Sequence, residues 1–446
     1  MNPLADHPTV RRVRERQPAP TEPLDADALR RIALEAGADD AGVVALDRDD
    51  LGSDLERERE HARRLWPNAR AFLAFVVRMN REPIRSPARS VANVEFHHAV
   101  RAVDDVAHRI VAALERRGVP ARNPSAGFPM EMERFPGRVW TVAHKTVAEA
   151  AGLGRMGVHR NVIHPVFGNF VLLGTVVVDG PVDAPPRPLD FDPCLSCKLC
   201  VAACPVGAIG ADGSFDFVAC TTHNYREFMG GFADWVETVV ESGSREEYRE
   251  RVGAEETASM WQSLSFGANY KAAYCMAVCP AGEDVIGPYL ESPPAHRRAV
   301  LDPLRERVET VYVVAGSDAE RHVARRFPHK RAERVGNGLV PRSIAAFLRY
   351  LPRAFQPGAA GELDATYHFV FTGAERAEAT VTIRAGRVAV DEGLAGEPDL
   401  RVDADARAWL RFLGRRRTLV WSLLTRRIRL AGPARLLRAF GRCFPS

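Results

Sequence analysis

Closely spaced cysteines are the residues of this chain whose chemistry is clearest. The run reads Cys194-Leu-Ser-Cys197-Lys-Leu-Cys200-Val-Ala-Ala-Cys204-Pro205, which is the pattern C-x2-C-x2-C-x3-C-P. This pattern is typical of [4Fe–4S] ligands, with three cysteines on one cluster and the fourth on a neighbouring cluster. Structural zinc sites usually take their ligands in two separated pairs, so the spacing fits zinc poorly.

A second motif, Cys275-Met-Ala-Val-Cys279-Pro280, repeats the end of the first, and Cys220 lies between them. Two such motifs predict two clusters that exchange their final ligands. We assign Cys194, Cys197, Cys200 and Cys279 to cluster 1, and Cys204, Cys220 and Cys275 to cluster 2. Cluster 2 then lacks one thiolate, because Ala272 holds the position that the spacing requires. It is either a [3Fe–4S] cluster or a [4Fe–4S] cluster with a non-Cys or open ligand. In the alternative, Cys220 is a structural thiol and there is one cluster.

Composition and length set the class of protein. The chain has 446 residues, 46% of them hydrophobic and 26% charged, which is typical of a soluble protein of two or three domains. Seven of the 8 cysteines lie between Cys194 and Cys279, which favours metal binding in a reducing compartment. No apolar segment follows Arg11-Arg12, and no apolar run is long enough to span a membrane. We therefore expect a cytoplasmic protein. Its net charge of +4 is too small to indicate a nucleic acid partner.

Buried strands alternate with helices in the first part of the chain. Residues 41–46, 71–77 and 169–178 are predicted strands, and residues 95–117 have the apolar spacing of a helix. This order predicts an α/β domain. The stretch Gly152-Leu-Gly154-Arg-Met-Gly157 matches a dinucleotide fingerprint, but a helical segment precedes it where a strand is required. We expect these glycines to allow tight turns, either for packing or beside a bulky flat ligand.

After a predicted linker near residues 330–342 the pattern changes. A helix that Ser343 can cap is followed by predicted strands at 365–372, 377–384 and 386–390, which indicates a separate α+β module. From Arg407 to Arg442 there are 11 arginines and no acidic residue. This segment is either a solvated helical face or a peripheral contact with an anionic membrane surface.

Residues 24–290 resemble the epoxyqueuosine reductases and, more distantly, the corrinoid reductive dehalogenases. Besides the cysteine motifs, the resemblance is carried by Glu95-Phe-His97, Ala151-Gly-Leu-Gly154, Gly157, Asn161, Pro165, Gly168 and Leu173-Gly174. It implies a cobalamin held over the α/β domain and two iron–sulfur clusters that pass electrons to it. The external electron donor would be a flavodoxin, a ferredoxin or a reductase. The implied corrinoid contacts are Gly152, Gly154, Gly157 and Asn161.

Two residues are catalytic candidates through this resemblance. His97 would contact the corrinoid or donate a proton, or else be a surface or capping residue. Lys145 would stabilise negative charge beside a reduced cobalt, or else pair with Glu149 one helical turn away. The chain also departs from the reductases, because His144-Lys145 replaces their Glu-Arg pair and the expected acidic position falls at Arg138 or Val139. The proton donor is therefore missing, which disfavours tRNA modification.

Residues from about 340 to 446 resemble a sterol carrier protein type-2 domain, through the helix–strand–strand opening and Asp399-Leu-Arg-Val-Asp403 before an amphipathic helix. That family implies a hydrophobic tunnel for lipids, so we expect an apolar lipid- or acyl-type substrate. The alternative function is an electron-transfer protein without corrinoid. The predicted parts are a disordered N-terminus (1–23), an α/β reductase-like, candidate cobalamin-binding domain (24–185), a ferredoxin-like double-cluster domain (186–290), an additional strand and linker (291–340) and the lipid-carrier-like module (341–446).

Overall fold

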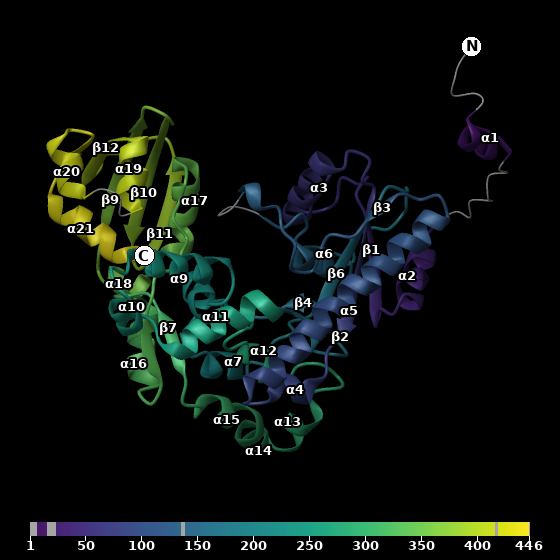
Figure 1. Ribbon diagram of the computed structural model, residues 1–446. Coiled ribbons are helices and arrows are strands. Elements are labelled where there is room, and N and C mark those ends of the chain that lie inside the picture. The colour runs from purple at the N-terminus through teal and green to yellow at the C-terminus, as the bar shows by residue number, and fades with distance from the viewer. Residues whose placement is uncertain (1–6, 16–23, 135–138, 415–417, 446) are drawn as a thin grey trace, which may run out of the picture.

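The computed structural model describes residues 7–15, 24–134, 139–414 and 418–445. Figure 1 shows three parts, which we call the N-terminal part, the central part (residues 186–340) and the C-terminal module (residues 341–445). No helix within the described ranges combines the length and apolar character needed to cross a membrane.

The N-terminal part is built on a four-stranded sheet with the order β1-β2-β6-β3. Its strands are β1 (Asp40–Ala45), β2 (Ala71–Arg78), β3 (Ala121–Arg122) and β6 (Val171–Val178). All three pairings are antiparallel. The three predicted strands are confirmed as β1, β2 and β6, and the sheet that they form is antiparallel.

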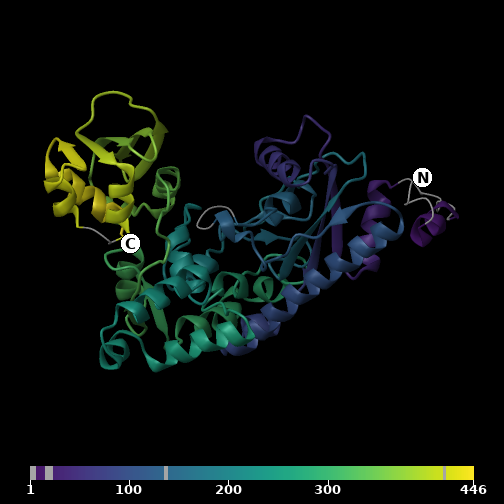
Figure 2. The same ribbon diagram turned by 45° about the horizontal axis from the view of Figure 1, so that its top comes forward.

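Helices cover both faces of this sheet, because alternate residues of β2 point to opposite sides. Leu73 and Phe75 pack towards α2 (Ala26–Glu35) and α5 (Arg89–Arg116). Phe72 and Ala74 pack in the other core with α3 (Ser53–Leu65) and α6 (His144–Ala150). The result is a three-layer domain in which α5 is the longest helix, and Figure 2 shows it running from the sheet towards the central part.

Shorter elements complete the N-terminal part. They are α1 (Pro8–Glu15), α4 (Arg81–Arg85), η1 (Met132–Arg134), β4 (Arg155–Met156) and β5 (Val162–Ile163). β4 and β5 form a small antiparallel pair. Helix α1 corrects the expectation that residues 1–23 are disordered, at least over its own eight residues. Residues 1–6 and 16–23 lie outside the described ranges.

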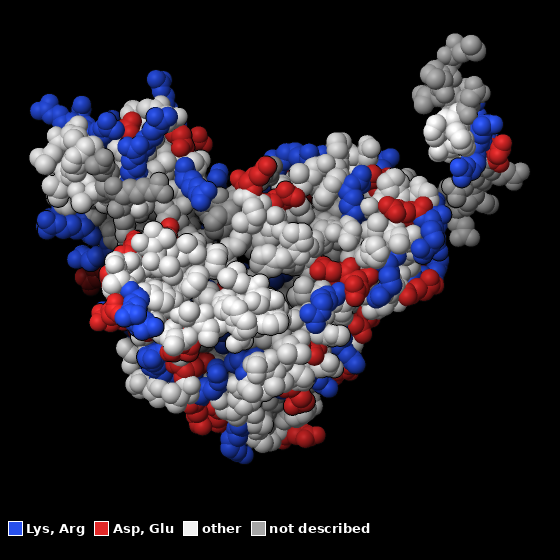
Figure 3. Space-filling view, viewed as in Figure 1, with Lys and Arg blue, Asp and Glu red and all other residues white. Residues whose placement is uncertain are grey.

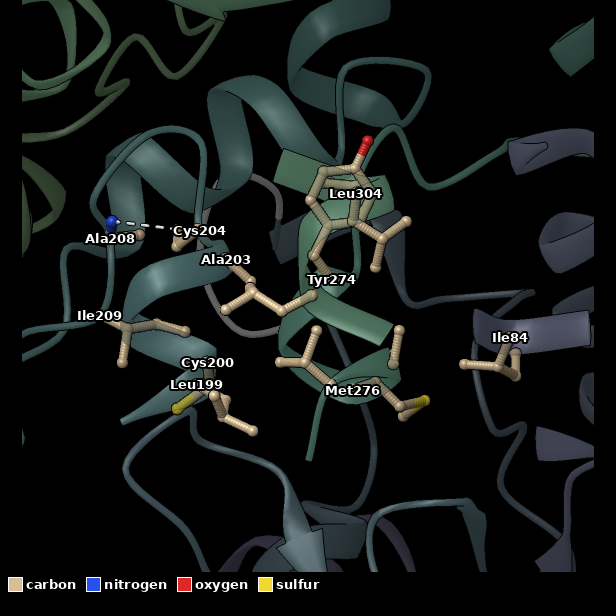
Figure 4. Packing of buried hydrophobic residues seen from close by; sticks show 14 of the residues in the cluster. Ile84, Leu199, Cys200, Ala203, Cys204, Ala208, Ile209, Tyr274, Met276 and Leu304 are labelled. Atoms are coloured by element: carbon tan, nitrogen blue, oxygen red, sulfur yellow. Dashed lines mark hydrogen bonds between the residues drawn. The ribbon is translucent and has the colours of Figure 1, made fainter. Parts of the chain in front are cut away.

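The central part is mostly helical. Its first helices are α7 (Leu199–Ala203), α8 (Phe217–Asn224), α9 (Met229–Glu241), α10 (Arg245–Arg251), α11 (Ala254–Phe266), α12 (Tyr274–Ala277) and α13 (Gly287–Glu291). Helices α9 to α11 form an insert between Cys220 and Ala272. Helices α7 and α12 pack together, and Figure 4 shows Leu199, Ala203 and Tyr274 in their shared core.

Residues 291–340 contain more structure than the predicted strand and linker. They form α14 (Pro293–His296), η2 (Arg297–Leu301), α15 (Asp302–Arg305), β7 (Thr310–Val313), α16 (Asp318–Arg326) and β8 (Arg331–Arg334). The prediction of a linker from residue 330 was wrong at its start, because β8 pairs in parallel with β7. Val311 and Val323 join the core around the cysteines, so this segment completes the central part.

The C-terminal module is an α+β unit, and its predicted helix and three strands are confirmed. Its elements are α17 (Ile344–Ala354), α18 (Pro357–Ala360), β9 (Ala365–Thr372), β10 (Ala377–Arg384), β11 (Arg387–Glu392), β12 (Leu400–Asp405), α19 (Ala406–Leu413), α20 (Leu419–Leu424), β13 (Ile428–Ala431) and α21 (Ala434–Cys443). The sheet order is β11-β10-β9-β12-β13, with β9 and β12 parallel. Aromatic rings of Phe347, Phe369 and Trp409 pack in its core at 5.5–6.0 Å. The lipid tunnel implied for this module stays a prediction.

Candidate metal centre

The structure brings together the four cysteines predicted for cluster 1, which we call the first thiol group. Cys194 and Cys197 lie on the loop before α7, Cys200 lies on α7, and Cys279 follows α12. Burial raises the pKa of Cys279, and the charges of Cys197, Cys200 and Cys194 raise it further. Burial, with the charge of Cys197, raises the pKa of Cys200 to about 11. Thiols that perturb one another in this way lie close together.

The second thiol group consists of Cys204, Cys220 and Cys275. Cys204 caps the end of α7, Cys220 lies within α8, and Cys275 lies within α12. Burial raises the pKa of Cys220, and the charges of Cys204 and Cys275 add to the effect. Burial and the charges of Cys204 and Cys200 raise the pKa of Cys275 to about 12. Ala272 is buried in the same core, at the position where a fourth thiolate was expected. Its backbone N–H donates to Asn224 Oδ1 at 3.1 Å.

The chemistry of these side chains fits iron–sulfur clusters. Thiolates are the soft ligands that such clusters take. Backbone N–H groups point at two of the sulfurs, from Val158 to Cys194 Sγ at 3.4 Å and from Ala208 to Cys204 Sγ at 3.3 Å. Among the described side chains, no three His, Cys, Asp or Glu groups converge enough to hold a single metal ion. A cluster does not require that convergence, because each thiolate binds a different iron atom. The assignment of individual ligands stays a prediction.

Lys145 lies beside the second thiol group. The charges of Cys275 and Cys220 act to raise its pKa, although burial is the larger influence and lowers it. Its Nζ donates to the backbone oxygen of Arg160 and, at 3.1 Å, to Asn161 Oδ1. The alternative pairing with Glu149 is not formed, since Glu149 Oε1 accepts the Met156 N–H at 2.8 Å.

A hollow borders the second thiol group. The Lys145 side chain is exposed, yet surrounding protein desolvates it enough to lower its pKa. Tyr225 is 38% exposed, and burial nonetheless raises its pKa strongly. Side chains that are accessible to water and still surrounded by protein line a concave surface. Figure 3 shows a recess near the centre of this face, between the insert and the N-terminal part.

Aromatic rings form one wall of this hollow. The Tyr225 ring lies edge-on to Phe228 and Tyr270, with centroids 5.2 and 5.4 Å apart, and Phe128 stacks on Phe228 at 5.9 Å. Charges of Cys220 and Cys275 contribute to the raised pKa of Tyr225, which places it next to the second thiol group. Sequence reasoning missed Tyr225, and the only signal was its position shortly after Cys220 on the same helical segment. A cluster of aromatic rings of this kind suits a flat macrocycle such as a corrin.

The glycines predicted to contact a corrinoid are explained by packing. A Cβ on Gly152 would lie 2.8 Å from Arg187 O, and one on Gly154 would lie 2.4 Å from Ile163 O. A Cβ on Gly157 would lie 2.8 Å from the Ile163 side chain. Gly152 and Gly154 therefore require glycine because the chain packs against itself, whereas Gly157 meets only side-chain atoms. Corrinoid contact at these positions stays a prediction. Asn161, the fourth candidate, holds Lys145.

The two histidines near the site make structural contacts. His97 Nε2 lies 3.0 Å from Ala268 O, which ties α5 to the end of the insert. His144 contacts Thr175 Oγ1 at 2.9 Å and Ser125 O at 3.1 Å, and burial lowers its pKa. Val139 is buried, and Arg138 lies outside the described residues.

Comparisons with known proteins support part of this picture. The family model for a 4Fe-4S binding domain matches residues 188–210. An epoxyqueuosine reductase of Bacillus anthracis is 27% identical over 184 residues, which cover 40% of this chain and 41% of that protein. One of Synechococcus sp. (strain CC9605) is 27% identical over 205 residues, 41% of this chain and 60% of that protein. The resemblance to the epoxyqueuosine reductases is confirmed. The matches span 41% to 60% of the length of these two relatives.

Solved structures also match at low similarity. A reductive dehalogenase matches with a TM-score of 0.40 and 16% identity, covering 70% of this chain and 39% of its own. Epoxyqueuosine reductase from Streptococcus thermophilus matches with a TM-score of 0.34 and 15% identity, covering 61% and 74%. Sterol Carrier Protein 2 Like 2 from Aedes aegypti has a TM-score of 0.19 and 21% identity, covering 21% and 87%. TM-scores below 0.5 do not establish a common fold. The sterol-carrier resemblance therefore stays a prediction.

Proposed function

We propose that this protein is an iron–sulfur reductase in which electrons enter at cluster 1 and leave cluster 2 into the hollow beside Lys145 and Tyr225. The observation that carries the proposal is the assembly of two thiol groups from segments that are far apart in the sequence. The curated relatives are reductases by name, which supports the same class of reaction.

The first thiol group is the better placed to receive electrons. The loop before α7 lies at the surface, where Phe191 is 38% and Leu195 is 41% exposed. An external flavodoxin, ferredoxin or reductase would dock there. The charge of Cys200 also contributes to the raised pKa of Cys275, so the two groups are neighbours and the internal electron step is short.

The second thiol group faces the hollow in which we place the substrate. Bound there, a corrinoid would supply low-potential cobalt for the reduction. Lys145, held by Arg160 and Asn161, places a positive charge at the wall, and Tyr225 presents a hydroxyl on the aromatic side. These residues would orient the substrate and stabilise negative charge that develops on it.

Modified tRNA is the first candidate substrate, which departs from the expectation of no nucleic acid partner. The relatives are named for epoxyqueuosine, and one solved relative contains a tRNA stem loop. Between Arg407 and Arg442, residues 415–417 lie outside the described ranges, and the other eight arginine side chains are exposed. Figure 3 shows basic side chains along the outer edge of the C-terminal module. Exposed arginines suit a phosphate backbone.

An apolar lipid- or acyl-type substrate is the second candidate. It is favoured by Val420 and Leu424, which are 65% and 79% exposed on α20. The two candidates are distinguished by expressing this protein in a strain that lacks epoxyqueuosine reductase and measuring whether queuosine is restored. Restored queuosine with the intact chain would support tRNA. No restoration, with salt-independent binding of acyl chains by the C-terminal module, would support the apolar substrate.

The first test is EPR on anaerobically purified protein after incubation with cobalamin and gel filtration. We expect two reducible cluster signals and a retained Co(II) signal without nitrogen splitting from the dimethylbenzimidazole base. Tyr225→Leu should weaken corrinoid retention. Trp261→Leu is the matched control, because Trp261 is 59% exposed on α11 and packs on Phe266. Cluster signals with all corrinoid washed away would leave an electron carrier without cobalamin.

A further inference from the structure

Two arginines are buried between the N-terminal and central parts without enough partners. Arg85 ends α4 and Arg89 begins α5. The Arg85 side chain is 13% exposed, and Arg89 is 7% exposed. Within the described chain, the Nε and Nη2 atoms of both guanidinium groups are buried and have no hydrogen-bond partner.

Buried charges of this kind are expensive unless something of opposite sign lies beside them. Arg85 uses only Nη1, which lies 3.3 Å from the exposed carboxylate of Glu82. Arg89 donates from Nη1 to the backbone oxygens of Ile84 and Ser86 at 3.2 and 3.0 Å. No carboxylate among the described residues pairs with Arg89. The buried N–H groups therefore need an acceptor that the protein alone does not provide.

The surroundings of Arg89 add further positive charge. Glu309 lies near Arg89 but already binds Arg307 and Lys330. Arg89 is also at the first turn of α5, a 28-residue helix whose N-terminal end carries the positive end of its dipole. The net balance around the second thiol group is therefore cationic.

The charge of a different thiol group acts on each arginine. Helix α4 packs on α12, which carries Cys275. The Arg89 guanidinium stacks over Tyr274 at 5.2 Å, and the charge of Cys275 acts on Arg89. The Arg85 guanidinium lies 5.2 Å from the centre of the Phe170 ring, and the charge of Cys279 acts on it. Burial is the largest influence on both arginines, and it lowers their pKa.

We propose that Arg85 and Arg89 are the buried counter-charges of the two iron–sulfur clusters, Arg85 for cluster 1 and Arg89 for cluster 2. This inference rests on the proposed function. A thiolate-ligated cluster is anionic and gains one more negative charge when it accepts an electron. A neighbouring guanidinium stabilises the reduced form and raises the reduction potential. Arg85 and Arg89 are thus positioning residues that set the potential of each cluster.

The test is an anaerobic redox titration of the full-length protein, with each cluster followed by its own EPR signal. Arg85→Met should lower the midpoint potential of cluster 1, and Arg89→Met that of cluster 2. We expect at least a tenfold change in the one-electron reduction constant, which corresponds to about 59 mV. Arg101→Met is the matched control, because Arg101 lies on α5, is exposed and should leave both potentials unchanged.

Lysine variants keep the test decisive if the methionine variants lose iron. Arg85→Lys and Arg89→Lys retain the charge and should keep most of the native potential. Unchanged potentials in iron-loaded methionine variants, or equal shifts in lysine and methionine variants, would overturn the proposal. Absence of iron and sulfide from the native protein would instead refute the proposed function. The two failures are therefore distinguishable.

Discussion

Replacing Gly168 by alanine should separate residues 279–285, which we call the Cys279 segment, from the N-terminal part. Gly168 has a φ of +64°, and a Cβ there would lie 1.9 Å from Ala281 O and 3.2 Å from a methyl of Val285. Next to this contact, Glu283 N donates to Pro165 O at 2.9 Å, and Asp284 N donates to Val166 O at 3.0 Å. The backbones touch so closely that the added methyl must push the segment away by about 1 Å.

The expected cost has two parts. Alanine in the left-handed region costs about 1 kcal/mol. Loss of the two hydrogen bonds that join Glu283 and Asp284 to Pro165 and Val166 costs about 1 kcal/mol each. Gly168→Ala should therefore lower the free energy of unfolding by about 3 kcal/mol in total. For a domain of 150–250 residues that is a fall in Tm of roughly 6–12 °C.

The measurement is thermal unfolding by circular dichroism under anaerobic conditions, together with iron content. Gly118→Ala is the matched control, because Gly118 has a φ of +74° and no atom within 4 Å of the added Cβ. Its free energy of unfolding should fall only by the backbone cost of about 1 kcal/mol, and its iron content should equal that of the native protein. If Gly168→Ala has the same Tm as Gly118→Ala and keeps its iron, the close contact between Gly168 and Ala281 does not hold the Cys279 segment in place.

Three further predictions concern the second cluster, acid stability and a buried ion pair. Ala272→Cys should supply the missing thiolate and remove any [3Fe–4S] EPR signal seen in the native protein; a persisting signal would place the open position elsewhere. Partial burial acts to raise the pKa of Asp40, but hydrogen bonds from His164 and an arginine lower it to about 2. The resulting stability is present above about pH 4 and is lost as the pH falls towards 2, so Asp40→Asn should cost about 1–2 kcal/mol in urea unfolding at pH 7 and flatten that acid dependence. Glu309→Gln should cost about 3–5 kcal/mol in the free energy of unfolding, because it removes the counter-charge of the buried Lys330, whereas Glu255→Gln, in an exposed pair, should change it by under about 1 kcal/mol.

The closeness of the cysteines could be predicted from sequence because ligand spacing is set by the geometry of the cluster, while their division between two clusters stays a prediction. The buried strands were also predictable, since β2 and β6 are runs of apolar residues that only a covered sheet can hold. Strand β8 was missed because its four residues, Arg331–Arg334, are almost all charged and mostly exposed. It is a strand through its pairing with β7, which no local pattern reveals.

The surroundings of the thiol groups could not be predicted from sequence. The sequence around Arg85 and Arg89 does not indicate that the fold buries Arg89 and leaves the Arg85 side chain only 13% exposed. Tyr225 caps the C-terminal end of α8, and its place beside Cys220 and Cys275 depends on how α8 meets α12. The glycines after α6 were recognised, but their cause lies in contacts with Arg187 and Ile163 rather than in their own sequence.

Helix α5 has a mechanical consequence for access to the site. Its 28 residues span about 42 Å, from Arg89 beside Cys275 to Leu114 in the core of the sheet. One continuous rod therefore belongs to both the N-terminal and central parts, so these cannot hinge apart without breaking it. The same helix also holds the neighbouring segments, because His97 on α5 contacts Ala268 O at the end of the insert, and Asp104 on α5 accepts the Ala126 N–H near Phe128. The two sides of the hollow are therefore fastened to the same helix.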